Sequence, residues 1–402
     1  MSPVREIGHP QLIQELVTEI QDSGRISFAR FMEQALYHEQ FGYYMTQRDG
    51  TTDASAPRIG WKGDYVTTPH FHTFLAKSLV RQIREMDECL GYPDSFVIVE
   101  MGAGAGLLAR DVLRECATTV PDLYHRLTYL LIERSPAMRV MQKHAVHEFS
   151  GPEGCVSWVN SLDELGDALL TGVLFSNELV DAFPVHRICI KRGTVQEVFV
   201  EYQDDQFIER LSTPSTAALE SFVSRWGIPL VDGYTTEVNL QAVAWMKDVA
   251  RVLAQGFVVT IDYGHTARDY FAPERNSGTL VGYYRHQFET NPYERVGLQD
   301  LTAHVNFSSL VDTGEAVGLQ CTGFTDLQHF LLSVGIEAML KDCDQEGEEV
   351  KAAAQLLNPR GMGRTFKILI QQKGLSECPE LSGLRYRPFF EDVLECGESV
   401  VH

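Results

Sequence analysis

Short apolar runs alternate with amphipathic stretches along most of the chain. The clearest run is Val97–Val99, which is followed by Glu100, three alternating glycines and an amphipathic stretch over 107–113. This order predicts a buried strand, a tight loop and a helix. Further runs predict buried strands over 127–132, 156–159, 172–176, 257–261 and 366–370. Such an alternation indicates an α/β fold with a doubly wound, Rossmann-like sheet.

The pattern outside these runs indicates additional segments. Residues 9–22 have apolar positions at helical spacing, and Ser27 is expected to cap a second helix. Residues 186–202 alternate as a β-hairpin does, and residues 203–250 are expected to be mostly helical. We therefore expect an N-terminal helical, substrate-side segment at 1–75, a core at 76–373 with the hairpin and helical insertion at about 185–250, and a peripheral tail at 374–402.

The glycine loop after the first predicted strand carries the strongest chemical signal. Its spacing is Glu100-x-Gly102-x-Gly104-x-Gly106, whereas a dinucleotide-binding loop would need its third glycine at Leu107. Glycines remove the Cβ atoms that would hold a ligand away from the backbone, and the following helix presents free N–H groups. We therefore favour S-adenosylmethionine over NAD as the cofactor, bound by Glu100 and the three glycines.

Residues at the ends of the other predicted strands are candidates for the rest of the cofactor site. In open α/β sheets, ligands bind beyond the carboxyl ends of the strands. Glu133 follows the second strand, where it would accept both ribose hydroxyls. Ser161 and Leu162 follow the third strand and would meet an adenine ring, while Asn177 follows the fourth strand and would face the cofactor.

Composition and charge narrow the classes of partner and compartment. The 402 residues carry a formal net charge of -21, which argues against a nucleic-acid backbone as partner and permits a cationic substrate. The eight cysteines form no C-x-x-C pair, so we expect reduced thiols and no metal site. We find neither a signal or transit peptide nor an apolar run of the roughly 18 residues that a membrane span needs. These features predict a cytoplasmic location.

Six motifs in fixed order resemble the MidA family of class I S-adenosylmethionine-dependent methyltransferases, and the similarity extends from about residue 27 to residue 373. They are Tyr37-His38 with Phe41–Tyr44, Gly63–Pro69, the glycine loop, Asn177-Glu178 with Asp181–Pro184, Ile261–Gly264, and Asp300–Val305. The resemblance implies a seven-stranded sheet, a cofactor contact by Thr67, and methylation of a protein, with arginine as the target. Because mitochondrial members of the family assist assembly of respiratory complex I, it also suggests that link. Ala103, Ala105 and His70 depart from the residues common in relatives.

The chemistry of arginine methylation points to acidic side chains. An enzyme mainly positions a nucleophile for in-line displacement at the methyl group, and a guanidinium is a charged, poor nucleophile. A carboxylate that holds two of its N–H groups leaves electron density on another nitrogen. Glu178 is the first candidate for this role, with Asp181 or Asp64 as helpers. His304 is a candidate for accepting the released proton, with a structural role as the alternative.

Three alternatives stay open at this point. Methyltransferases of DNA or of glutamine usually have an Asn-Pro-Pro-aromatic loop after the fourth strand, and here Asn177 is followed by Glu178-Leu179-Val180, which disfavours those substrates. An NAD-dependent oxidoreductase would be distinguished by reduced-cofactor absorbance and by calorimetry with both ligands. A non-catalytic assembly factor would retain the cofactor fold and bind a partner without methyl transfer. The target protein and the oligomeric state are not specified by the sequence.

Overall fold

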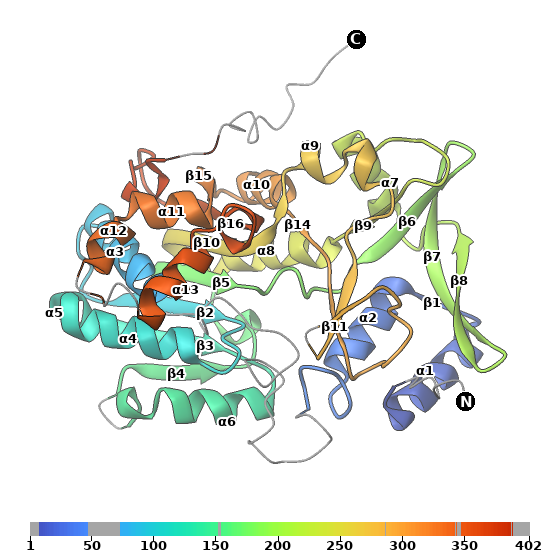
Figure 1. Cartoon of the computed structure of the whole chain (residues 1–402), viewed down its shortest axis with the longest axis horizontal. Coiled ribbons are helices and arrows are strands. Elements are labelled where there is room, and N and C mark those ends of the chain that lie inside the picture. Colours follow the sequence, from blue (N-terminus) through green and yellow to red (C-terminus); the bar gives the residue numbers. More distant parts are fainter. Residues whose placement is uncertain are drawn as a thin grey trace, which may run out of the picture. The chain divides into compact units, whose positions relative to one another are not determined.

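The chain forms two compact units (Figure 1). The computed structural model describes residues 8–46, 73–151, 154–285, 287–341, 343, 347–386 and 388. The first unit draws its described residues from the ranges 1–65, 181–243 and 267–304, and the second unit from 66–180, 244–266 and 305–402. This grouping differs from the three consecutive segments expected, because two later segments fold with the N-terminal residues.

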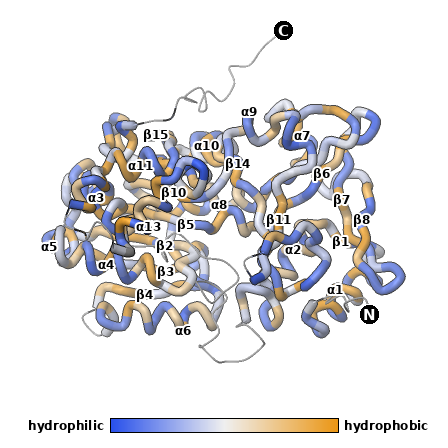
Figure 2. Tube along the Cα trace, in the orientation of Figure 1, coloured by the Kyte–Doolittle hydropathy of each residue, from blue (hydrophilic) through white to orange (hydrophobic). Residues whose placement is uncertain are grey.

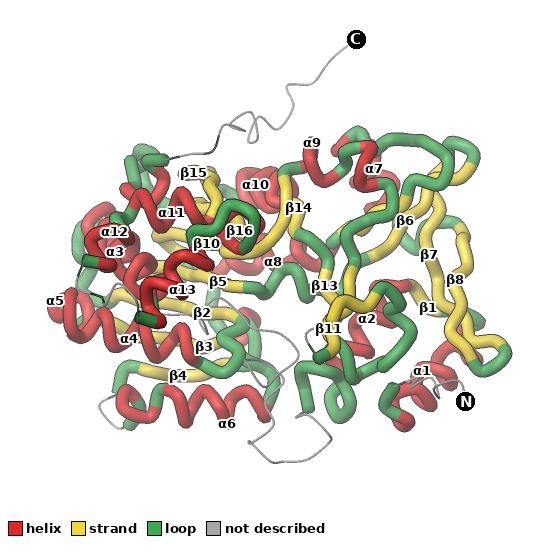
Figure 3. The backbone as a smooth tube through the Cα atoms, viewed as in Figure 1, coloured by secondary structure: helices red, strands yellow, loops and turns green. Residues whose placement is uncertain are grey.

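The second unit contains a mixed sheet whose strands follow the order β15-β16-β10-β5-β2-β3-β4, with a short β14 paired to β10 (Figure 3). Their bounds are β2 Phe96–Met101, β3 Leu127–Ile132, β4 Val156–Val159, β5 Leu170–Asn177, β10 Leu253–His265, β14 Val305–Asn306, β15 Gln320–Asp326 and β16 Phe366–Lys373. Strands β4, β3, β2, β5 and β10 are parallel, and β16 is antiparallel to both of its neighbours. The expected seven-stranded, Rossmann-like α/β sheet is therefore confirmed along this path.

The core of the second unit explains why its strands were recognisable. The parallel strands β2, β3, β5 and β10 are largely hydrophobic (Figure 2), as expected for strands that are buried on both faces, whereas the edge strand β4 is only partly buried. Phe96, Tyr129, Phe175 and Phe257 are fully buried within the same apolar cluster. The helices that contribute to this unit are α3 Phe74–Cys89, α4 Leu107–Thr119, α5 Pro121–Tyr124, α6 Pro136–Ala145, the C-terminal part of α8 Leu240–Val252, α10 Phe307–Ala316, α11 Leu327–Ser333, α12 Ile336–Leu340, α13 Glu348–Leu356 and α14 Met362–Thr365.

The first unit combines helices with two small sheets. Its larger sheet follows the order β1-β7-β6-β9, with β8 on the other side of β7, and its smaller sheet follows β12-β11-β13. The strands are β1 Ile26–Ser27, β6 His186–Lys191, β7 Thr194–Gln203, β8 Gln206–Ser212, β9 Thr235–Val238, β11 Val281–Tyr284, β12 Gln287–Glu289 and β13 Asp300–Thr302. The helices are α1 Pro10–Ser23, α2 Phe28–Tyr37, α7 Ala217–Trp226 and α9 Ala267–Tyr270. Ser27 caps α2 as predicted, because its Oγ accepts the amide of Arg30 at 3.1 Å.

Two expectations about the chain outside the main sheet need correction. Residues 203–250 are not mostly helical, since β8 and β9 lie within them and β8 pairs with β7 through a turn at Asp204 and Asp205. The segment after residue 374 is not wholly peripheral, because Leu381 and Leu384 are buried in the second unit's core. The amide of Gly383 also donates to the side chain of Gln82 at 2.9 Å. Among the described helices, none is long and apolar enough to cross a membrane.

Candidate functional site

The glycine loop joins β2 to α4 in the second unit. Gly102, Gly104 and Gly106 have φ angles of 77°, 51° and 79°, in the left-handed region that favours glycine. A Cβ on Gly102 would lie 2.9 Å from Cδ1 of Leu179, and one on Gly106 would lie 3.0 Å from Cα of Gln142. Backbone conformation and close packing therefore both call for glycine at the first and third positions, in addition to any requirement of a ligand.

Glu133 lies just beyond the carboxyl end of β3, and its carboxylate is held by two donors. Oε1 accepts the amide of Ser135 at 2.8 Å, and Oε2 accepts Nε2 of Gln142 at 3.0 Å. Burial raises the pKa of Glu133, and these hydrogen bonds oppose that shift. A carboxylate has about four acceptor positions, so within the described part of the chain one remains on each oxygen. That arrangement suits a ligand with two neighbouring hydroxyls.

Asn177 and Glu178 lie where β5 ends and the next turn begins. Asn177 is only 9% exposed, and its Nδ2 donates to Oε1 of Glu178 at 3.1 Å. Its Oδ1 is buried, and no described residue donates a hydrogen bond to it. Because a buried acceptor without a donor is costly, this oxygen is suited to bind a ligand donor.

Glu178 adopts a strained backbone conformation. Its φ of 54° is uncommon for a residue other than glycine, and such conformations concentrate at functional sites. The turn is fixed by the amide of Glu178, which donates to the carbonyl of Ile261 on β10 at 3.0 Å. The buried carboxylate of Asp262 also accepts the amides of Leu179 and Val180. The half-buried Glu178 carboxylate is thus presented by a rigid turn at the end of a central strand.

Glu100 has a different environment from the other predicted cofactor residues. It lies within β2, is 2% exposed, and accepts a hydrogen bond from the hydroxyl of the buried Tyr129 on β3. Burial raises the pKa of Glu100 to about 7, an effect that the bond from Tyr129 opposes. A contact between Glu100 and a cofactor stays a prediction. Burial of this side chain does not favour the contact.

The residues after β4 give weaker indications. Ser161 is half-buried, and Leu162, the first residue of a short 3-10 helix over Leu162–Glu164, is 5% exposed. Both follow the carboxyl end of β4, next to the end of β3 in the sheet. Their contacts with an adenine ring stay predictions, and Leu162 has little apolar surface to offer.

Three motifs that are far apart in sequence come together in the first unit. The hydroxyl of Tyr37 donates to the carbonyl of Ala182 at 2.9 Å, and that of Tyr44 donates to Asp300 at 2.6 Å. The rings of Tyr37 and Tyr44 stack with centroids 5.4 Å apart. The amide of Ala303 donates to the carbonyl of Asp181 at 2.9 Å. Asp181 and the segment that carries His304 are therefore neighbours.

A buried acid fixes the backbone at His304. The amide of His304 donates to Oγ1 of Thr279 at 3.0 Å, and that hydroxyl donates to Oε2 of Glu237, also at 3.0 Å. Glu237 further accepts the amide of Thr279 at 2.8 Å and is only 2% exposed. Glu237 and Thr279 were not predicted as site residues, because neither carries a recognisable motif of its own. A proton-accepting role for His304 stays a prediction.

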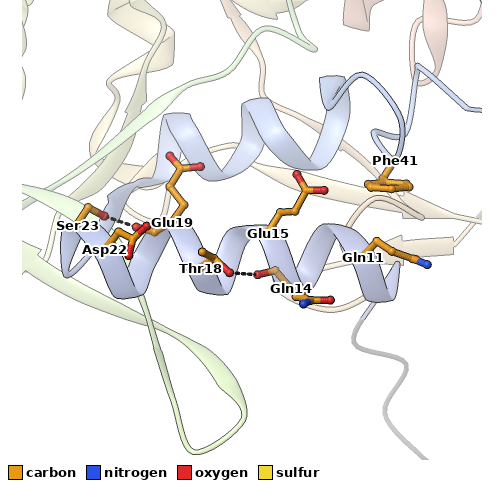
Figure 4. A pocket seen from close by; sticks show the side chains of 8 residues that line it. All are labelled: Gln11, Gln14, Glu15, Thr18, Glu19, Asp22, Ser23 and Phe41. Carbon is orange, nitrogen blue, oxygen red and sulfur yellow. Dashed lines mark hydrogen bonds between the residues drawn. The ribbon is translucent and has the colours of Figure 1, made fainter.

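Asp64 and Thr67 are outside the described residues. A hollow of about 750 Å³ on the first unit lies along α1 (Figure 4), and no predicted site residue lines it. Two of its acids are paired, Glu15 with His38 and Glu19 with Arg30, each at 2.8 Å. Across the described ranges, no group of three or more His, Cys, Asp or Glu side chains could hold a metal ion.

The second unit therefore offers a set of groups that fits an adenosyl cofactor with a cationic amine. Glu133 provides paired acceptors, Asn177 provides a buried acceptor, and the loop backbone is held in the left-handed region. Gln142, which contacts both Glu133 and the glycine loop, is not among the site residues predicted from the sequence. No local signal marks it, because a single glutamine in an amphipathic helix is usually assigned to the surface.

Comparisons with known proteins agree with this chemistry. Residues 74–325 match the family model described as S-adenosyl-L-methionine-dependent methyltransferase. The chain is 26% identical to the mitochondrial protein arginine methyltransferase NDUFAF7 homolog of Drosophila melanogaster, over 92% of this chain and 86% of that protein. It is also 26% identical to the Mus musculus protein arginine methyltransferase NDUFAF7, over 88% and 83%.

A solved structure is similar over almost its full length. The protein from Burkholderia thailandensis bound to S-adenosyl-homocysteine superposes with a TM-score of 0.83 and 29% identity, covering 94% of this chain and 95% of that one. The expectation of a cytoplasmic location is wrong by these comparisons, since the curated relatives are named as mitochondrial proteins. The lack of a recognisable leader in the sequence was not a sufficient reason for that expectation.

Proposed function

Because the chain belongs to this family of S-adenosylmethionine-dependent methyltransferases, we propose that it methylates an arginine side chain of a protein. The observation that carries the proposal is the placement of Glu178, a half-buried carboxylate on a strained turn at the carboxyl end of β5. The names of the relatives support arginine as the target. The net charge of -21 is compatible with a basic segment as the substrate and disfavours nucleic acid.

On the cofactor side, residues of the second unit bind and orient S-adenosylmethionine. The carboxylate of Glu133 accepts the two ribose hydroxyls while Ser135 and Gln142 hold it in place. The buried Oδ1 of Asn177, to which no described residue donates a hydrogen bond, accepts a donor of the cofactor's methionine portion. When bound, S-adenosylmethionine supplies an electrophilic methyl group on a sulfonium. Positioning by these groups turns a bimolecular encounter into an oriented one, which is where most of the rate enhancement of such a displacement arises.

On the substrate side, Glu178 accepts two N–H groups of the guanidinium. This grip localises the positive charge on the nitrogens that it contacts and leaves the remaining nitrogen more nucleophilic. Asp181 and Asp64 are the assisting acids in this proposal, and His304 accepts the proton that the methylated nitrogen releases. The rigid turn at Glu178 serves this role because a carboxylate that moved freely would lose the alignment.

The direct test is methyl incorporation. The purified chain is incubated with labelled S-adenosylmethionine and an extract of its own cells, and labelled proteins are digested and sequenced by mass spectrometry. We expect label on arginine. Label on glutamine, lysine or nucleic acid would overturn the arginine assignment while leaving the methyltransferase in place. Calorimetric binding of the cofactor with no incorporation into any acceptor would instead favour a non-catalytic assembly factor.

A further inference from the structure

Gln142 joins three segments of the second unit through one side chain. Its Nε2 donates to the carbonyl of Gly104 and to Oε2 of Glu133, each at 3.0 Å. Its Oε1 accepts Nε1 of Trp158 on β4 at 3.1 Å. Gln142 is fully buried on α6. Both N–H groups of its amide are therefore used, one on the glycine loop and one on the acid after β3.

We infer that Gln142 is a positioning residue for cofactor binding, an inference that rests on the proposed binding of the ribose hydroxyls by Glu133. A carboxylate turns easily about its last bond, and an incorrectly turned Glu133 could not meet two neighbouring hydroxyls together. Ser135 holds one oxygen through its backbone amide, and Gln142 holds the other. The plane of the carboxylate is thus set before a ligand arrives, so binding does not have to order it.

The same amide couples this acid to the glycine loop. The carbonyl of Gly104 is held by Gln142, and Cα of Gln142 fills the space that a Cβ on Gly106 would take. The loop and Glu133 therefore have a common support, and Trp158 fixes the amide in the orientation in which Nε2 faces both acceptors. In the reversed orientation, Oε1 of Gln142 would face the carbonyl of Gly104 and the carboxylate of Glu133. The indole N–H of Trp158 excludes that orientation, because it requires an acceptor.

The first test compares two apolar replacements. Gln142→Leu keeps the volume but removes both donors, and we expect affinity for S-adenosylmethionine and S-adenosylhomocysteine to fall about tenfold or more. Turnover at saturating cofactor should change far less, because Gln142 acts through Glu133 and the loop. The control is Gln371→Leu, which removes a second fully buried glutamine of the same unit, one that contacts the carbonyl of Leu310 on α10. It should lower stability without changing cofactor affinity.

The second test is a double-mutant cycle with Glu133→Gln. If Gln142 works by orienting Glu133, the two losses in affinity should be clearly smaller together than the sum of the separate losses. Additive losses would overturn the inference, as would an unchanged affinity in folded Gln142→Leu or an equal loss in Gln371→Leu. A parent chain that binds no S-adenosylmethionine would instead refute the proposed function. If Gln142→Leu does not fold, Trp158→Phe leaves Gln142 in place but removes the N–H donor that fixes its amide, and it should also weaken cofactor binding.

Discussion

The carboxylate of Asp262 accepts a hydrogen bond from the backbone amide of Val180 at 3.0 Å. The same oxygen accepts the amide of Leu179 at 3.3 Å, and the other oxygen accepts the amide of Tyr263 at 2.9 Å. Asp262 is fully buried on β10, whereas Leu179 and Val180 follow β5. An acid on one strand thus fixes the turn after its neighbour, and that turn carries Glu178.

Replacing Asp262 should affect catalysis more than cofactor binding. In Asp262→Asn, the NH₂ group that replaces one oxygen faces either the amide of Tyr263 or the amides of Leu179 and Val180, and the loss of charge weakens the hydrogen bonds to the oxygen that stays. The free energy of unfolding should therefore fall by about 1–3 kcal/mol. Because the turn at Glu178 becomes less rigid, methyl transfer should fall while the affinity for S-adenosylmethionine changes little. Urea unfolding, calorimetry and labelled-methyl incorporation on one preparation measure the three effects. Asp326→Asn, which changes a buried acid that caps α11, is the control and should leave methyl transfer intact.

Glu178→Gln should separate the chemistry from binding. The substitution keeps the shape but replaces one acceptor oxygen with an NH₂ group that faces the donors of the guanidinium. We expect methyl transfer to fall about a hundredfold or more, with unchanged cofactor affinity. The exposed Glu220 on α7 supplies the control, Glu220→Gln, which should retain full activity. Full activity in Glu178→Gln would show that Glu178 does not hold the guanidinium, and Asp181 or Asp64 would then be the candidate for that role.

Gly104→Val should prevent cofactor binding in a folded protein. Gly104 has a positive φ of 51°, so any side chain adds strain, and a β-branched one adds more. Gly91→Val is the matched control, because Gly91 lies in the same unit with a φ of 75°, and a Cβ added there would meet nothing within 4 Å. Both variants should lose stability, as measured by thermal unfolding, but only Gly104→Val should lose affinity in a calorimetric titration. If Gly104→Val bound S-adenosylmethionine as tightly as Gly91→Val does, the glycine loop would not be part of the cofactor site.

The buried acid Glu100 predicts a pH dependence of stability. Because burial raises its pKa from 4.5 to about 7, the folded chain binds more protons than the unfolded chain between these values. The contribution of Glu100 to stability therefore decreases as pH rises through this window, by on the order of 3 kcal/mol in total. Glu100→Gln should lack this decrease while still accepting the Tyr129 hydroxyl. Urea unfolding of the parent and of Glu100→Gln at pH 5 and pH 8 measures this decrease. If the difference in free energy of unfolding between the two proteins were the same at both pH values, the raised pKa of Glu100 would be contradicted.

Local pattern was sufficient for the strands of the main sheet. Leu127–Ile132 and Val156–Val159 are strands with the predicted bounds. The first is largely buried, which explains its apolar run, whereas the second is an edge strand whose residues are half-buried or exposed. The glycine loop and the Ser27 cap were equally readable, since each depends on backbone conformation within a few residues. The strand β8 was missed although a local signal existed. Asp204 and Asp205 have φ angles of 50° and 59°, as a two-residue hairpin turn requires, and aspartate tolerates this conformation.

Contacts between distant segments were decided only by the tertiary structure. Ile26 pairs with Val200, so the N-terminal helices share a unit with the hairpin and not with the sheet that follows them in sequence. Gln142 and Asp262 acquired their importance in the same way, because each side chain satisfies donors or acceptors on a segment far along the chain. A sequence pattern records whether a residue is apolar and at what period. It does not record which buried polar groups become partners, since that depends on how packed elements bring them within hydrogen-bonding distance.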